Sequence, residues 1–179
     1  METQTLYQKT ILFSAEKHKD QKVPGTDLTY LIHLSDVAME ILIACIHSGD
    51  LDPSFAVQLA LLHDTIEDTD TTFEEIKNEF GVEVAMGVDA LSKKDFPTKN
   101  ESMKDSLKRI KQQPKEVWAV KLADRITNLQ KPPDHWNNEK KLIYMKEAEL
   151  ILKELAEGNK YLVERLKKEI NKYKKYLSV

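Results

Sequence analysis

Apolar residues recur at helical spacing along nearly the whole chain, and the alternation typical of strands bounded by turns is hard to find. The clearest apolar stripe has spacings of four, three and four and consists of Phe55, Leu59, Leu62 and Ile66. Just before it, Asp52 is a suitable N-cap and Pro53 occupies the first helical position, where its missing N–H costs nothing. The pattern therefore predicts an all-α fold.

Turn-forming residues divide this pattern into segments. A loop rich in turn residues is expected near Gly25, and Thr72 with Glu75 indicates a capping box for a short helix that ends before Gly81. Other helices are expected over 5–19, 35–47, 53–69, 82–92, 101–112, 115–130, 138–157 and 160–177. We find no internal repeat or long linker, so residues 1–179 are expected to form one domain, with its core over 5–155 and a C-terminal helix over 160–177.

Composition narrows the class of protein. Of 179 residues, 41% are hydrophobic, 32% are charged, and only 5 are Gly and 6 Pro, which excludes disordered, collagen-like and membrane classes. The single cysteine, Cys45, excludes an intrachain disulfide and a cysteine-based zinc site. The N-terminus lacks a secretory pattern and no apolar run approaches about 20 residues, so we expect a cytoplasmic protein with no membrane partner.

The net charge of −3 conceals a separation of charge along the chain. Residues 23–76 contain no Lys or Arg and 11 acidic residues, so this stretch carries −11 and the remainder carries +8. It also holds three of the five histidines: His33, His47 and His63. The stretch is either a solvated acidic face or a site for a multivalent cation, and the near-neutral total argues against a nucleic-acid partner.

The segment from His63 to Thr69 contains one imidazole and three carboxylates, a dense cluster of groups that can bind a metal or transfer a proton. On one continuous helix His63 would share a face with Glu67, and Asp64 would share a face with Asp68. Adjacent carboxylates repel one another unless a cation compensates them, so the cluster favours a bound metal over a hydrogen-bonded histidine at the core edge. His33 and Asp124 are candidates to complete the coordination, and imidazole with carboxylate suits Mn²⁺, Fe²⁺ or Zn²⁺.

These residues resemble the H…HD…D signature of the HD-domain metal-dependent phosphohydrolases, whose fold is an all-α helical bundle. The resemblance is closest to the hydrolase domain of the RelA/SpoT alarmone enzymes and covers about residues 5–155. It is carried by Ala15-x-Lys17-His18-x-x-Gln21, Tyr30-x-x-His33-x-x-x-Val37-Ala38, His63-Asp64-x-x-Glu67-Asp68-Thr69 and Lys121-Leu122-Ala123-Asp124-Arg125-x-x-Asn128-Leu129. The chain is too short for the synthetase and regulatory domains, so it is similar to a small alarmone hydrolase.

The resemblance implies a mechanism and a set of site residues. Mn²⁺ would be held by His33, His63, Asp64 and Asp124, and Glu67 with Asp68 would position and activate the attacking water. The implied reaction removes pyrophosphate from the 3′ position of guanosine tetra- or pentaphosphate. The substrate candidates are Lys17, Lys22, Lys93, Lys94, Lys99, Lys121 and Arg125 for the diphosphates, Asn128 for the nucleotide, and Tyr144, with Trp136, beside the base. Helix packing is the alternative for the two aromatic residues.

Departures from the family pattern leave two choices for the purine base of the substrate. The loop after Gln21 lacks the usual Arg-Lys pair and Gly-x-Pro-Tyr, the usual His-Pro is His33-Leu34, and Thr127 replaces a histidine. Either guanosine or adenosine alarmones fit such a site. Two alternatives to alarmone hydrolysis are another HD phosphohydrolase, acting on a nucleoside monophosphate or NADPH, and a catalytically silent nucleotide sensor. The sequence does not fix the oligomeric state.

Overall fold

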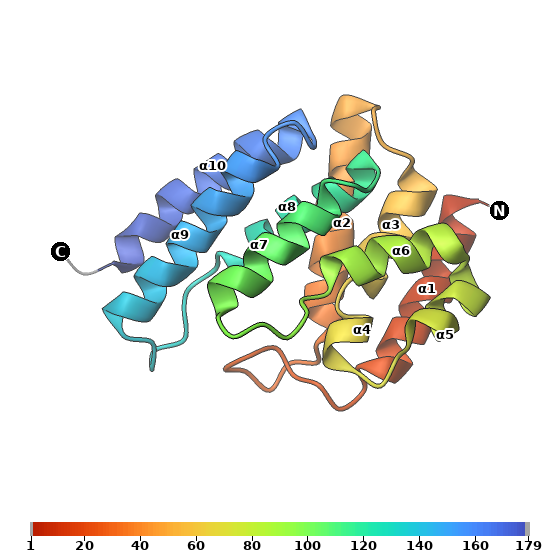
Figure 1. The fold of residues 1–179 in the computed structure, drawn as a ribbon, viewed down its shortest axis with the longest axis horizontal. Helices are drawn as coiled ribbons and strands as arrows, with labels where there is room; N and C mark the ends of the chain where they lie inside the picture. Colours follow the sequence, from red (N-terminus) through yellow and green to blue (C-terminus); the bar gives the residue numbers. More distant parts are fainter. Residues whose placement is uncertain (1, 178–179) are drawn as a thin grey trace.

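The computed structural model describes residues 2–177, except for the side chain of Lys99, and within that part it is helical without β-strands (Figure 1). This confirms the predicted all-α class. The helices are α1 (Thr3–Lys17), α2 (Leu31–Ser48), α3 (Pro53–Leu62), α4 (Thr65–Asp68), α5 (Phe73–Phe80), α6 (Val82–Leu91), α7 (Lys99–Ile110), α8 (Lys115–Asn128), α9 (Asn138–Glu154) and α10 (Lys160–Tyr173), followed by the 3₁₀ turn η1 (Lys174–Tyr176).

Helix α3 lies at the centre of the bundle. It packs against α1, α2, α6 and α8, and every residue from 56 to 62 is buried. Its start follows the sequence signal, because the Asp52 carboxylate accepts the backbone N–H of Ser54 at 2.8 Å. Gly87 lets α6 approach closely, since a Cβ there would lie 2.5 Å from Cδ2 of Leu59. The central position of α3 brings its C-terminal end to the middle of the molecule.

Helix α2 is long and strongly apolar. By length and mean hydropathy, 1.5 over Leu31–Ser48, it is long and apolar enough to cross a membrane, a property that the sequence interpretation missed. In the bundle α2 packs against α3, α8 and α10, and its residues Val37 and Ile41 are fully buried. A core helix meets the same criteria, and packing of this kind accounts for the composition of α2.

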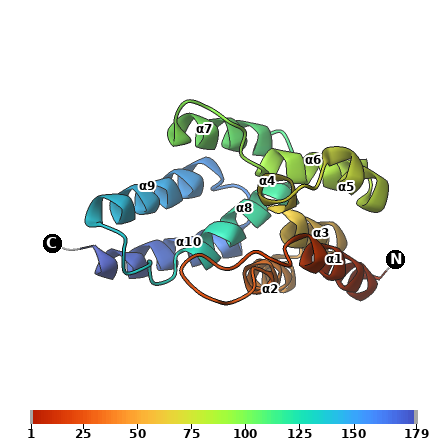
Figure 2. The ribbon, with the colours of Figure 1, turned by 90° about the horizontal axis from the view of Figure 1, so that it is seen from below.

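The C-terminal hairpin of α9 and α10 lies at the end of the molecule opposite α1 and α5 (Figures 1 and 2). Helix α10 packs against α8, α9 and α2. A salt bridge closes the contact with α2: the buried Glu40 carboxylate accepts the Nη2 and Nε donors of Arg165 at 2.9 and 3.2 Å. Arg165 also donates to Glu169 at 2.5 Å. The hairpin thus forms one wall beside α8.

Most helix boundaries differ from the predicted ones by a few residues, but two predictions are wrong. Helix α2 begins at Leu31 rather than at Ser35, so His33 lies inside the helix and not before it. The predicted helix over 53–69 is interrupted at His63 and Asp64, and α4 is a separate single turn. The inferred face-sharing of His63 with Glu67, and of Asp64 with Asp68, therefore fails as a helical argument.

Candidate active site

At the end of α3, two side chains take the place of backbone N–H groups as donors to backbone carbonyls, and this explains why the helix is interrupted before α4. The Nδ1 atom of His63 lies 2.8 Å from the carbonyl oxygen of Ala60. The Thr65 hydroxyl donates to the carbonyl oxygen of Leu62 at 2.6 Å. In a continuous helix these carbonyls would accept the N–H groups of residues 64 and 66. The competition ends α3 at the centre of the molecule, where His63 is only 2% exposed.

Four candidate metal ligands meet here, from α2, from α8 and from the interruption between α3 and α4. Nε2 of His33, on α2, lies 3.3 Å from Nε2 of His63, and Oδ2 of Asp64 is 2.9 Å from the latter nitrogen. The three donor atoms all lie within 4.8 Å of one another. Asp124 of α8 brings its Oδ1 to 3.6 Å from His33 and 3.9 Å from His63. Two imidazoles and two carboxylates thus converge on one point.

The outward hydrogen bonds leave both imidazoles suited to a metal. Because the carbonyl of Ala60 only accepts, the Nδ1 atom of His63 carries the proton in the neutral imidazole, the form that binds a metal, and Nε2 then keeps its lone pair. The Thr127 hydroxyl donates to the carbonyl of Asp124 at 2.9 Å and lies 3.4 Å from Nδ1 of His33. The Thr127 oxygen can therefore accept a hydrogen bond from the Nδ1–H group of His33, which again leaves the lone pair of Nε2 available for a metal. Two lone pairs facing each other at 3.3 Å repel, and either a proton on one nitrogen or a bound metal ion removes that repulsion.

The electrostatics agree with a cation site. Burial alone would lower the pKa of His63, but the carboxylates of Asp64 and Asp124 raise it to about 9. Burial likewise opposes ionisation of Asp64, yet His63 and then His33 hold the pKa of that carboxyl well below its usual range. For Asp124, Lys121 and then His63 overcome burial and lower its pKa. The site stabilises positive charge where its four donors meet.

Neighbours hold the two carboxylates in place. The phenol of Tyr30 donates to Oδ2 of Asp64 at 2.5 Å, and burial followed by this carboxylate raises the pKa of Tyr30. Lys121 donates to Oδ2 of Asp124 at 3.0 Å, and the amide of Asn128 donates to its Oδ1. Lys121 is only 5% exposed, so this predicted diphosphate contact already neutralises a buried carboxylate.

Asp64 and Asp124 face a cavity of about 1090 Å³, with both histidines behind them. The cavity lies between α4, the segment after α6, α8 and the start of α9. Its lining includes these residues from the sequence predictions: Glu67, Asp68, Lys93, Lys94, Lys121, Arg125, Asn128, Trp136 and Tyr144. Two of the three remaining cations that we predicted to bind substrate lie outside this lining. Lys17 pairs with Glu75 at 2.8 Å, and Lys22 lies on the loop after α1, bridged to Thr29. The side chain of the third, Lys99, is outside the described residues.

Arg125 forms the far wall with Tyr144. Its guanidinium lies 4.5 Å from the centre of the Tyr144 ring and donates to Glu147 at 3.4 Å. The Nε and Nη1 donors of this buried side chain have no partner among the described residues. Trp136 packs edge-on against Tyr144 at 5.1 Å, so helix packing and contact with a ligand are compatible for both rings. Arg125 lines the cavity, and an arginine with two unused donors is suited to an anionic ligand.

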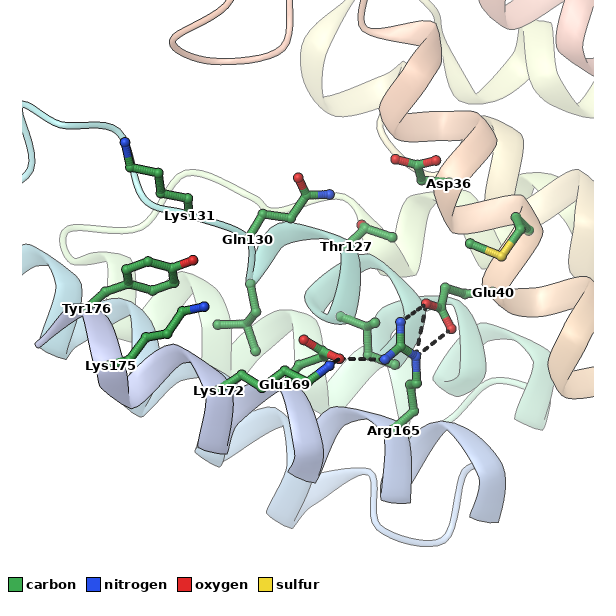
Figure 3. A pocket seen from close by; sticks show the side chains of 13 residues that line it. Asp36, Glu40, Thr127, Gln130, Lys131, Arg165, Glu169, Lys172, Lys175 and Tyr176 are labelled. Carbon is green, nitrogen blue, oxygen red and sulfur yellow. Dashed lines mark hydrogen bonds and ion pairs between the residues drawn. The ribbon is translucent and has the colours of Figure 1, made fainter.

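A second cavity of about 410 Å³ lies between α2, the end of α8 and α10 (Figure 3). At one end Arg165 joins Glu40 and Glu169, and at the other Lys175, Tyr176 and Gln130 gather. The arginine is fully engaged in ion pairs, and none of the four candidate metal ligands lines this cavity. Its ion pairs serve the packing of α10.

Sequence reasoning gave no role to Tyr30, His18 or Gln21, although all three lie in the motifs that carry the resemblance. His18 and Gln21 follow the end of α1, and Gln21 donates to Oδ2 of Asp68 at 2.8 Å. No periodicity links them to the site, because only the folded loop brings residue 21 beside residue 68.

Comparisons with known proteins agree with this architecture. The profile of the HD domain matches residues 11–158. The chain is 32% identical over 163 residues to guanosine-3′,5′-bis(diphosphate) 3′-pyrophosphohydrolase MESH1 of Danio rerio, covering 88% of each chain, and 31% identical over 160 residues to MESH1 of Homo sapiens, covering 87% of each. A solved structure described as a metazoan ortholog of SpoT that hydrolyses ppGpp superposes with a TM-score of 0.82 at 24% identity, covering 96% of this chain and 97% of the other.

Proposed function

Because the chain belongs to the HD-domain family of metal-dependent phosphohydrolases, we propose that it removes pyrophosphate from the 3′ position of a purine alarmone, as the names of its MESH1 relatives state for them. One observation carries the proposal. Two of the four convergent metal-ligand candidates face the same cavity as Glu67 and Asp68. A metal, a base and room for a polyanion are the elements that phosphohydrolysis needs.

The HD domain implies a divalent metal ion, and the donor set fits one, since each histidine presents Nε2 and the carboxylates are ionised. We propose His33, His63, Asp64 and Asp124 as its ligands and Mn²⁺ as the ion, because mixed nitrogen and oxygen donors suit Mn²⁺. Such an ion, when bound, lowers the pKa of a coordinated water and offsets charge on phosphoryl oxygens.

The chain's own carboxylates handle the proton. Glu67 and Asp68 lie one turn beyond Asp64, on α4, and both line the cavity. Burial raises the pKa of Asp68 above its usual value, with Asp64 and Glu67 adding to that effect against the hydrogen bond from Gln21. A carboxylate with a raised pKa is a better proton acceptor at neutral pH, so we assign Asp68 and Glu67 to orient the water and take its proton.

The cations of the cavity serve the substrate. Arg125 offers two buried donors, and Lys93, whose pKa Glu67 raises against burial, remains charged beside the carboxylates. We propose that these two bind diphosphate oxygens, with Lys22 and Lys99 as further candidates from outside the described lining. Asn128 would contact the nucleotide and Tyr144 the base. Lys121 would act mainly through Asp124.

The base of the substrate stays open between guanine and adenine, since the loop after Gln21 carries no arginine. The deciding experiment supplies Mn²⁺ and a panel of guanosine and adenosine 3′-pyrophosphates, with released pyrophosphate as the readout. Pyrophosphate release from either series supports the proposal and ranks the bases. Orthophosphate as the only product would favour another HD phosphohydrolase, and tight binding without product would favour a sensor.

We also propose that the chain acts as one domain, because a single hydrophobic cluster joins residues from α2 to α10. A cytoplasmic location would suit the free Cys45 thiol.

A further inference from the structure

His18 is a buried histidine that the proposed chemistry does not use. It follows the last residue of α1, is 1% exposed, and lies outside the candidate metal set. Its Nδ1 atom is 2.5 Å from Oε1 of Gln21, whereas its Nε2 atom is buried with no partner among the described residues. Burying a polar ring with only one hydrogen bond costs stability, so we expect that one hydrogen bond of His18 to have a function.

The hydrogen-bonding capacities determine the direction of this chain of contacts. The Asp68 carboxylate accepts, so the Gln21 atom 2.8 Å from its Oδ2 is the amide nitrogen. The amide oxygen of Gln21 then faces His18 and also accepts, so Nδ1 of His18 carries the proton. His18 therefore donates a hydrogen bond to Gln21, and Gln21 donates one to Asp68.

Backbone and ring contacts hold Gln21 on both sides. Its N–H donates to the carbonyl of His18 at 3.0 Å, and its carbonyl accepts the N–H of Tyr30 at 3.0 Å. The His18 ring stacks on Tyr30 with centroids 5.1 Å apart, and Tyr30 in turn donates to Asp64. The amide of Gln21 thus approaches Asp68 from a fixed backbone.

We propose that Gln21, oriented by His18, is a positioning residue that occupies Oδ2 of Asp68 and leaves Oδ1 for the water. This inference rests on the proposed function, because it takes Asp68 as a proton acceptor in that reaction. Oδ1 of Asp68 has no hydrogen bond within residues 2–177, which fits an atom kept free for a ligand. Preorganised partners of this kind fix a catalytic group in its productive orientation.

The charged and titratable groups around Asp68 are Asp64, Glu67 and His18. The two acids raise the pKa of Asp68, and the N–H of Gln21 lowers it. Loss of the Gln21 amide should therefore raise the pKa of Asp68 further and move the acid limb of the pH–rate profile to higher pH.

The test uses Gln21→Met, which keeps the chain length and removes the amide, with the exposed Gln8→Met on α1 as its matched control. We expect kcat to fall about 10- to 100-fold with little change in KM, the acid limb to move up, and Mn²⁺ affinity by calorimetry to stay as in the wild type. Unchanged kcat and pH profile in an active wild-type background would overturn the inference, as would a parallel loss of Mn²⁺ affinity. Failure of the wild type to release pyrophosphate would instead refute the proposed function.

Two variants of His18 separate its hydrogen bond from its stacking. His18→Asn keeps a donor for Gln21 and loses the stack, whereas His18→Phe keeps a ring against Tyr30 and loses the donor, together with the unpartnered Nε2. We expect His18→Phe to reproduce the kcat loss and pH shift of Gln21→Met, and His18→Asn to recover most of the activity. The opposite order would show that His18 acts by packing and would remove it from the proposal.

Discussion

Glu67 accepts two hydrogen bonds from one residue, Lys93: the backbone N–H at 2.7 Å and the side-chain ammonium at 3.0 Å. The lysine follows α6, so the contact fixes a carboxylate of α4 against the next segment of the cavity wall. Glu67→Gln can keep one of these contacts through its amide oxygen, but its amide nitrogen only donates, so it loses the other contact together with the ability to take a proton.

We expect Glu67→Gln to retain Mn²⁺ and to lose at least about 100-fold in kcat, the usual scale of a general base. Steady-state rates of pyrophosphate release, with metal content from the same preparation, provide the measurement. Glu74→Gln on the exposed face of α5 is a control. An unchanged rate would remove Glu67 from the mechanism.

Asp64→Ala should abolish both metal content and pyrophosphate release, because it removes a donor from the candidate set and leaves the Tyr30 hydroxyl without its acceptor. Metal analysis after dialysis against Mn²⁺ measures the first effect directly. The exposed Asp70→Ala serves as the matched control on the same acidic stretch. Full activity in Asp64→Ala would contradict the assignment of Asp64 as a metal ligand.

Arg125→Lys should raise KM about tenfold or more, with a smaller effect on kcat. Lysine keeps the charge but loses the planar group that stacks on Tyr144 and the two buried donors that have no partner among the described residues. Tyr144→Phe keeps the ring and is expected to change KM less. If both variants matched the wild type, the diphosphates would have to bind elsewhere in the cavity.

The pair of Glu40 and Arg165 makes a stability prediction. Arg165→Met leaves a carboxylate that is 4% exposed without its partner, and we expect a loss of up to about 3 kcal/mol in the free energy of unfolding. Because Arg165 is itself a third exposed, water limits the loss. Urea titrations of this variant and of the Glu40→Met, Arg165→Met double variant provide the comparison. The double variant should recover most of the loss, and a purely additive result would contradict the explanation.

The metal-free protein should become less stable as pH rises from about 6.5 to 9. The folded pKa of His63 is about 9, above the unfolded value of about 6.5, so its contribution is complete below 6.5 and disappears as pH rises through 9. Thermal melts across this range, with EDTA or with Mn²⁺, test the effect. The metal-loaded protein should lack this slope, because its imidazole has already lost the proton. Parallel curves would exclude His63 as the cause.

Local signals predicted much of this fold. The Asp52 and Thr72 caps depend on neighbours in sequence, and both side chains accept the backbone N–H groups that the pattern indicated. The predicted capping box is only half formed, because the Glu75 carboxylate pairs with Lys17 instead of the Thr72 backbone. The convergence of His33, His63 and Asp124 followed from motif residues that lie on separate helices. The caps are visible in sequence because residue type and local spacing define them, whereas the full ligand set was implied by the resemblance to the HD-domain family.

Other features depend on tertiary contacts. The break after Leu62 arises because the His63 and Thr65 side chains bind backbone carbonyls, a competition that hydrophobic periodicity does not reveal. The contact of Gln21 with Asp68 spans 47 positions and forms only when the loop after α1 closes. Lys121 shows a third limit, since a lysine assigned to substrate proves to be buried against Asp124.

The short interruption between α3 and α4 limits how this site could be transplanted. Consecutive residues of a straight helix point about 100° apart, so two neighbours do not both turn toward one ion. A graft of His63-Asp64-x-x-Glu67-Asp68 onto an uninterrupted helix would keep every donor and lose their convergence. A portable version needs the irregular backbone and the two carbonyls that sustain it, so the smallest transferable unit runs from Ala60 to Asp68.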